Sequence, residues 1–141
     1  MKKWIIPLFI LGTMFSVLFI QNQFSVEATI KKDELRVHRY YTLLQEEKWK
    51  EALELVHVDS KDASIDKKVE ALQTSPASFT RYAIQQVDHL DGAHYSFVVH
   101  VTKEEDGIQN IYEDRVFVDE KTKKLSITST DPNLALRSGE M

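Results

Sequence analysis

Apolar and polar residues alternate through most of the second half of the chain, and this pattern predicts β-strands. Two long alternating runs, between Ala93 and Val118, meet at Asp106-Gly107, a dipeptide typical of a two-residue hairpin turn. A hinge there places Glu105 opposite Ile108 and fixes the register of the residues beyond it. Four further pairs then share one mainly apolar face: Val101 with Tyr112, Val99 with Asp114, Phe97 with Val116, and Tyr95 with Val118.

A second Asp-Gly dipeptide, Asp91-Gly92, predicts an earlier hairpin that joins a strand from Phe79 to Leu90 to the same sheet. This hinge brings three further pairs to the apolar face: Tyr82 with Val101, Ile84 with Val99, and Gln86 with Phe97. Because two separate turns agree on which face is apolar, that face is expected to be buried.

A third turn, around residues 120–123, leads to a last strand from Leu125 to Thr130. Pairing Asp119 with Lys124 brings Leu125 and Ile127 beside residues of the apolar face. The three turns together predict a four-stranded antiparallel meander.

The first half of the chain repeats its apolar residues at helical spacing. Asp33 is a candidate N-cap for a helix that runs to Leu44, and a stripe from Trp49 to Val56 follows out of phase. We therefore expect two helices at an elbow, or one kinked helix, and a third helix from Ile65 that ends near Ser75-Pro76. The predicted fold class is α+β, with two to three N-terminal helices packed on one face of the meander.

Residues 1–28 follow a different pattern. Lys2 and Lys3 precede an apolar run from Trp4 to Ile20, and Val26-Glu27-Ala28 supplies small residues at a plausible cleavage position. This predicts a signal peptide or an uncleaved membrane anchor, with the domain outside the cytoplasm. We therefore expect an extracytoplasmic protein, secreted or held at the membrane only by residues 4–20. Its single domain would span 29–130, and the tail 131–141, which has no periodicity, would fray.

Composition narrows the function further. The net charge is −4 with acids and bases interspersed, so nucleic acid is not an expected partner. The chain has no cysteine, which excludes disulfides and thiol catalysis. We find no glycine-rich phosphate loop, nucleophile elbow or zincin helix, and we expect no cofactor.

The order of elements resembles the nuclear transport factor 2-like (cystatin-like) superfamily, in particular its small exported or anchored bacterial members. Three segments carry the resemblance: residues 40–44 (YYTLL), residues 47–53 (EKWKEAL), and the strand pattern that ends at 125–127 (LSI). A tryptophan often found near the start of the last strand is absent here, where Leu125 stands. The resemblance implies a curved sheet around helices, often with a pocket, but it implies no particular function.

Asp114 is the least expected residue on the apolar face, because an unpaired carboxylate is costly there. In a pocket with tyrosines, Asp114 would suit proton abstraction. Alternatively, a bulge turns Asp114 outward, or a residue at the rim of the sheet forms a hydrogen bond with it. The predicted ligand pocket consists of Tyr41, Trp49, Tyr82, Tyr112 and Asp114. These aromatic residues equally suit the core of a small domain.

His89 and His94 face each other in the predicted first hairpin, at a spacing that could hold a metal ion. A third ligand is not evident, so no metal site is predicted.

The opposite face of the sheet is expected to be the partner-binding surface. Val87, Val98 and Phe117 supply apolar side chains there, among charged residues that include Arg115. The predicted binding residues are Val98, His100, Glu113, Arg115 and Phe117. The sequence thus favours a non-enzymatic module that binds a protein or envelope partner, or itself, through this face. A small-ligand pocket is the alternative, and a small enzyme using Asp114 is the third hypothesis.

Overall fold

The computed structural model describes the backbone of residues 5–57, 65–91 and 94–138, and the side chains of these residues from 21 onward except 22 and 91. The chain forms two compact units, Met1–Asp33 and Glu34–Met141. In the part of the chain whose side chains are described, no helix combines the length and the apolarity needed to cross a membrane. The predicted signal peptide or anchor depends largely on residues outside that part.

The first helix, α1 (Ile5–Gln45), is continuous through Asp33, so the predicted N-cap at Asp33 is wrong. Residues 21–45 contain neither proline nor glycine, and nothing in them interrupts the helical hydrogen bonds. The elbow after α1 is confirmed, because α2 (Trp49–Glu54) begins only after a three-residue turn. Glu47 adopts the left-handed conformation there (φ 58°), and the Lys48 N–H bonds the Leu43 carbonyl at 2.9 Å. A third helix, α3 (Ile65–Thr74), ends next to Ser75-Pro76 as expected.

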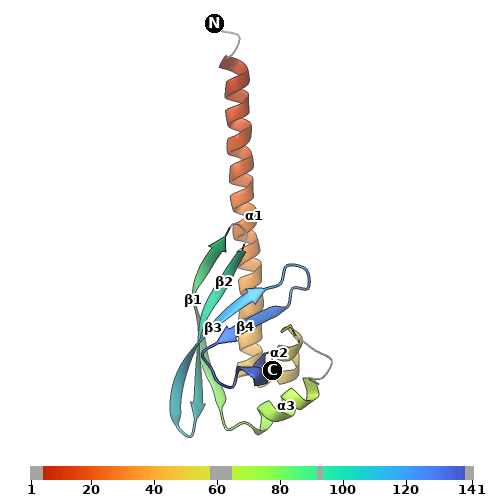
Figure 1. The fold of residues 1–141 in the computed structure, drawn as a ribbon, viewed down its shortest axis with the longest axis vertical. Coiled ribbons are helices and arrows are strands. Elements are labelled where there is room, and N and C mark those ends of the chain that lie inside the picture. The colour runs from red at the N-terminus through yellow and green to blue at the C-terminus, as the bar shows by residue number, and fades with distance from the viewer. Residues whose placement is uncertain (1–4, 58–64, 92–93, 139–141) are drawn as a thin grey trace. The chain divides into compact units, whose positions relative to one another are not determined.

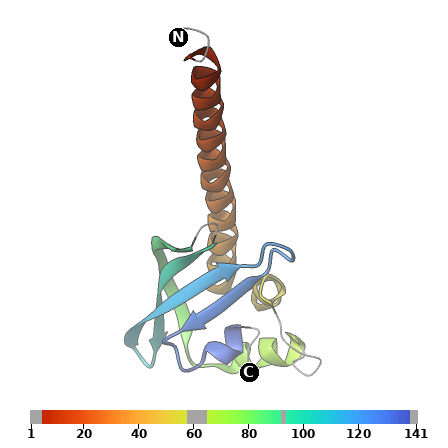
Figure 2. The same ribbon diagram turned by 45° about the horizontal axis from the view of Figure 1, so that its top comes forward.

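The sheet is the predicted antiparallel meander, in the order β1-β2-β3-β4 (Figures 1 and 2). Its strands are β1 (Ser78–Asp91), β2 (His94–Glu105), β3 (Ile108–Val118) and β4 (Leu125–Ser129). The register set by Asp106-Gly107 is confirmed from Glu105 opposite Ile108 to Phe97 opposite Val116, where the β2–β3 ladder ends. The β3–β4 register is also confirmed, with Val118 opposite Leu125.

The β1–β2 register agrees with the prediction only in part. Tyr82 lies opposite Val101 and Ile84 opposite Val99, but a bulge between Ile84 and Gln86 then shifts the pairing by one residue. Gln86 consequently lies opposite Val98 instead of Phe97. Val87 lies opposite Phe97, on the inner face of the sheet, instead of on the outer face where it was predicted.

The helices pack on the inner face of the sheet, where most of the core lies. Tyr41 of α1 stacks on Tyr82 of β1, with ring centroids 5.2 Å apart. The least exposed core side chains come from α1, α2 and all strands but β1; they include Val37, Tyr40, Leu44, Leu53, Phe97, Val99, Val101, Val116, Leu125 and Ile127.

Fraying was predicted for the whole tail 131–141, but its described part, residues 131–138, packs against the rest of the domain. Residues 134–137 form a short helix, α4 (Leu134–Arg137), and the Arg137 side chain is 1% exposed. The reason is electrostatic, because two buried carboxylates bind Arg137.

Candidate functional site

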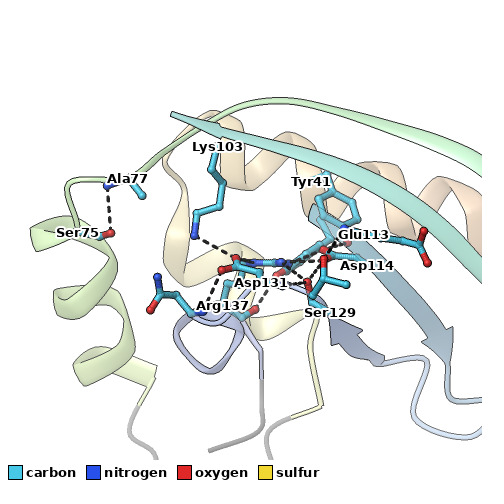
Figure 3. A network of polar contacts seen from close by, with 12 residues as sticks. Tyr41, Ser75, Ala77, Lys103, Glu113, Asp114, Ser129, Asp131 and Arg137 are labelled. Atoms are coloured by element: carbon cyan, nitrogen blue, oxygen red, sulfur yellow. Dashed lines mark hydrogen bonds and ion pairs between the residues drawn. The ribbon is translucent and has the colours of Figure 1, made fainter. Parts of the chain in front are cut away.

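Four buried charged residues form one ionic cluster beneath the inner face of the sheet (Figure 3). The Arg137 guanidinium binds Asp114 in a bidentate manner: Nη1 donates to Oδ2 at 2.6 Å and Nη2 to Oδ1 at 2.8 Å. Its Nε donates to Asp131 Oδ2 at 3.2 Å, and Lys103 Nζ donates to the same oxygen at 3.0 Å. Two carboxylates thus face two cations, and the cluster is formally neutral.

Backbone geometry places the two carboxylates. Asp114 lies on β3 directly opposite Ser129 of β4, and the Ser129 hydroxyl donates to Asp114 Oδ1. Ser129 Oγ in turn accepts the Asp131 N–H at 2.9 Å, and Asp131 Oδ1 accepts the Asn133 N–H at 2.9 Å. These bonds turn the chain after β4 so that α4 lies under the sheet.

Two α1 tyrosines hold the cluster from the helix side. Tyr41 OH donates to Asp114 Oδ2 at 2.6 Å, and Tyr40 OH donates to the Arg137 carbonyl at 2.6 Å. Burial raises the pKa of the Tyr41 phenol, and the Asp114 carboxylate raises it further, so this hydroxyl is held as a donor. Lys68 of α3 donates to the Ser138 carbonyl, which fixes the other end of the tail.

The surroundings of Arg137 and Asp131 favour their charged forms. Burial acts to lower the pKa of Arg137, but the hydrogen bonds to Asp114, together with the electrostatic effects of Asp114 and the two tyrosines, outweigh burial and raise that pKa above its ordinary value. Burial likewise acts to raise the pKa of Asp131, yet the Asn133 N–H, Arg137 and Lys103 together bring that pKa below its usual value. The Phe79 ring adds cation–π contacts, with its centroid 5.4 Å from Lys103 Nζ and 5.7 Å from Arg137 Cζ.

This arrangement suits a structural role for Asp114. Each of its two oxygens accepts two hydrogen bonds, from Arg137 and Ser129 on one and from Arg137 and Tyr41 on the other. A general base needs a lone pair directed at a substrate proton, and the lone pairs here are directed at these donors. Asp114 remains on the inner face, so the predicted outward-turning bulge does not occur at this residue.

The predicted pocket residues all lie on the inner side, but they pack with other groups. Tyr82 OH lies 3.1 Å from His38 Nδ1, Trp49 packs on Phe79 with ring centroids 6.1 Å apart, and the Tyr112 ring lies 5.5 Å from Lys103 Nζ. Trp49 also lines two hollows of about 180 and 170 Å³ near the elbow and α3, which the other four residues do not line. Both hollows are smaller than typical ligand pockets of roughly 300–1,000 Å³.

The two histidines of the first hairpin do not face each other. His89 lies opposite Tyr95, and His94 lies opposite Asp91, because the β1–β2 pairing shifts by one residue between Ile84 and Gln86 and again between His89 and Asp91. Among the described side chains there is no group of three or more His, Asp or Glu residues that could hold a metal ion.

The outer face of the sheet carries a ladder of ion pairs across three strands. Arg115 Nη1 lies 3.3 Å from Asp88 Oδ2 of β1, and Arg115 Nε lies 4.0 Å from Glu113 Oε1. Glu113 Oε2 lies 3.9 Å from His100 Nε2 of β2. These charged side chains are partly exposed, so the ladder remains accessible to a partner.

Val98 is too deeply buried for the predicted partner surface. It lies on the outer face as expected, but it is only 5% exposed. It occupies a central strand between Gln86 and Arg115, whose longer side chains flank it. Phe117 is half-buried, whereas Ile111, on the outer face opposite Thr102, is 65% exposed. Ile111 was not among the predicted binding residues, although its odd position on β3 matches those of Glu113, Arg115 and Phe117.

Most of the ionic cluster was also missed. Lys103 follows Val99 and Val101 in the alternation of β2, so it could have been placed on the inner face beside Asp114. Asp131 and Arg137 lie in a segment without periodicity, and the one indirect signal for them was that a buried Asp114 needs a cation.

The second unit thus shows an α+β architecture with an open four-stranded antiparallel sheet. Comparison with protein-family models, with curated proteins and with solved structures finds no match to this chain. Its function is therefore inferred from its own geometry.

Proposed function

We propose that this protein is a non-enzymatic module that binds a partner protein through the outer face of its sheet. The observation that carries the proposal is a row on β3 in which Ile111, Glu113, Arg115 and Phe117 project to the same side. Ile111 is largely exposed, Glu113 and Arg115 are exposed, and Phe117 is half-buried.

The row combines two kinds of contact that protein interfaces use. Its apolar ends can anchor a partner by burial, and an exposed isoleucine is an unfavourable group to leave in water. Its centre presents Glu113 and Arg115, whose ion pairs are long and solvated and can exchange for pairs with a partner. The expected partner surface is therefore apolar at its ends, with both signs of charge between them.

The buried cluster supports a binding role over a catalytic one. Its charged groups bind one another, whereas the partly exposed ion pairs of Arg115 with Asp88 and Glu113 lie on the outer face. A small-ligand pocket remains the second candidate function because Trp49 lines the two hollows near the elbow.

We further propose that the domain lies outside the cytoplasm and belongs to a known superfamily. The pattern of Lys2 and Lys3 before the apolar run 4–20 supports placement of the domain outside the cytoplasm, secreted or attached to the membrane. Helices followed by an antiparallel meander support kinship with the nuclear transport factor 2-like superfamily. The partner would then be an envelope or membrane protein.

Two isoleucines of β3 provide a matched test. Ile111 and Ile108 are 65% and 63% exposed, but their positions on the strand differ by an odd number of residues, so they belong to opposite faces. Full-length tagged protein is crosslinked in intact producing cells, purified, and compared with Ile111→Ser and Ile108→Ser by quantitative mass spectrometry.

We expect Ile111→Ser to reduce recovery of the partner by at least about fivefold, the effect of about 1 kcal/mol at an interface. Ile108→Ser should leave recovery unchanged. Equal recovery with all three proteins would contradict binding through the outer face.

A further inference from the structure

The free edge of the sheet lies along β1, the longest strand. The other edge is partly covered, because the Leu125 N–H bonds the Leu55 carbonyl at 2.9 Å and the His57 N–H bonds the Leu125 carbonyl at 2.8 Å. Among the described residues, no backbone segment pairs with the outer side of β1. The Gln45 side chain donates to the Thr80 carbonyl at 2.9 Å near the start of the strand. An exposed strand edge is a template for pairing with another chain.

The bulge in β1 determines which residues can meet at this edge. Before the bulge, Arg81 and Ala83 lie on the outer face and Tyr82 and Ile84 on the inner face. After the bulge, Gln86 and Asp88 are outer and Val87 is inner. Arg81 and Asp88 are seven positions apart and would lie on opposite faces of a regular strand; the bulge brings them to the same face.

A second copy of β1 fits this edge antiparallel to the first. The two copies would be related by a two-fold axis perpendicular to the sheet, which keeps the inner and outer faces continuous. With the axis between Ile84 and Gln85, Tyr82 faces Val87 of the other copy and Ala83 faces Gln86. Arg81 faces Asp88, and the symmetry repeats this pair on the other side of the axis.

The charges favour this register. The Arg81 side chain is exposed and makes no hydrogen bond or ion pair with any residue that the structure describes. Asp88 is half-buried, accepts the Gln86 amide at 2.7 Å and binds Arg115. Registers shifted by two residues place Arg81 opposite Gln86 or Leu90 instead, without an opposite charge.

We propose that the protein forms a symmetric dimer through its β1 edges, with each Arg81 paired to Asp88 of the other copy. The two four-stranded sheets then become one continuous sheet, in which backbone hydrogen bonds bind the copies and the two charge pairs fix the register. This interface uses the strand edge and leaves the β3 row free, so the dimer and the partner-binding surface can be tested separately.

The absence of cysteine allows a direct test of the register. Two differently tagged copies of the full chain, one Ala83→Cys and one Gln86→Cys, are produced in the same cells and oxidised with copper phenanthroline. Residues directly opposite in antiparallel strands have Cα atoms about 4.5–5.5 Å apart, within disulfide reach. The control replaces Gln86→Cys with Thr128→Cys, an exposed outer-face position on β4.

We expect a disulfide-linked dimer from Ala83→Cys with Gln86→Cys and at least about tenfold less from the control. A maleimide reagent establishes that all three cysteines are accessible. No enrichment over the control, with all cysteines accessible, would overturn the proposal.

Charge reversal provides a second, independent readout. Arg81→Glu should lower the dimer fraction of the full chain, measured by light scattering in a mild detergent, by at least about fivefold. Arg81→Glu combined with Asp88→Arg should restore most of it. A dimer fraction unchanged by Arg81→Glu would overturn the Arg81–Asp88 pairing.

Discussion

At the scale of single residues, Arg137 connects the tail to the sheet. It is 1% exposed, and its guanidinium binds both Asp114 and Asp131. Replacing a buried ion pair by apolar residues is often neutral, but removal of one partner leaves an uncompensated charge in the core. Tyr41 and Ser129 donate to Asp114 as well, so each oxygen of this carboxylate accepts two hydrogen bonds.

Loss of the Arg137 side-chain charge should therefore destabilise the fold strongly. We expect Arg137→Met to reduce the free energy of unfolding by about 3–5 kcal/mol, because Asp114 then loses the cation that binds it, whereas Asp131 keeps Lys103. Chemical denaturation of the full chain measures this change. The control is Arg115→Met, an exposed arginine on the same sheet, which should change stability by about 0.5 kcal/mol or less. Similar effects of the two substitutions would rule out a stabilising role for the cluster.

Asp131 should make stability depend on acid pH. Its folded pKa lies below its unfolded value of about 3.9, so its contribution is complete above that value and is lost as the pH falls through the folded pKa. The difference in unfolding free energy between the wild type and Asp131→Asn should be constant near neutrality and shrink below about pH 4. Denaturation curves across this range measure it. A difference that stays constant down to pH 2 would show that Asp131 does not titrate as described.

At the scale of elements, the turns account for both the accurate and the inaccurate parts of the sequence-based fold. Asp106 and Gly107 both have positive φ angles, as a two-residue hairpin turn requires, and the β2–β3 register followed correctly. The predicted β1–β2 register was wrong beyond Ile84, because a bulge depends on how two strands pack and no residue type at Gln85 indicates one. The prediction for the tail was wrong because Arg137 meets Asp114 only in the folded chain, and no local sequence pattern indicates this contact.

The elbow after α1 provides a prediction at this scale. Glu47 has a φ of 58°, where a side chain costs roughly 1–2 kcal/mol and glycine costs little. Glycine also loses more conformational entropy on folding, which offsets part of this gain. Glu47→Gly should therefore raise the free energy of unfolding by about 0.5–1 kcal/mol, measured by chemical denaturation. Glu46→Gly, in the same turn but without a positive φ, should lower stability by a similar amount. Destabilisation of equal size by both substitutions would refute strain at the elbow.

At the scale of the whole molecule, two groups of charged residues lie on the two sides of the sheet and have different consequences. The buried group is neutral overall and internally paired, and it connects α1, β2, β3 and the tail. The outer group is exposed and only loosely paired, and it lies between Ile111 and Phe117. Sequence alternation correctly placed Glu113, Arg115 and Phe117 on this face, but it could not show that Val98 would be covered.

The most direct measurement is photo-crosslinking from the β3 row. Benzoylphenylalanine is incorporated at position 111 of the full-length protein, or at position 108 as the control of nearly equal exposure, and producing cells are irradiated intact. We expect one adduct of defined mass from position 111, little or none from position 108, and loss of the adduct when Arg115→Glu is added. Equal adducts from both positions, or none from position 111, would contradict the proposal that the outer face binds a protein.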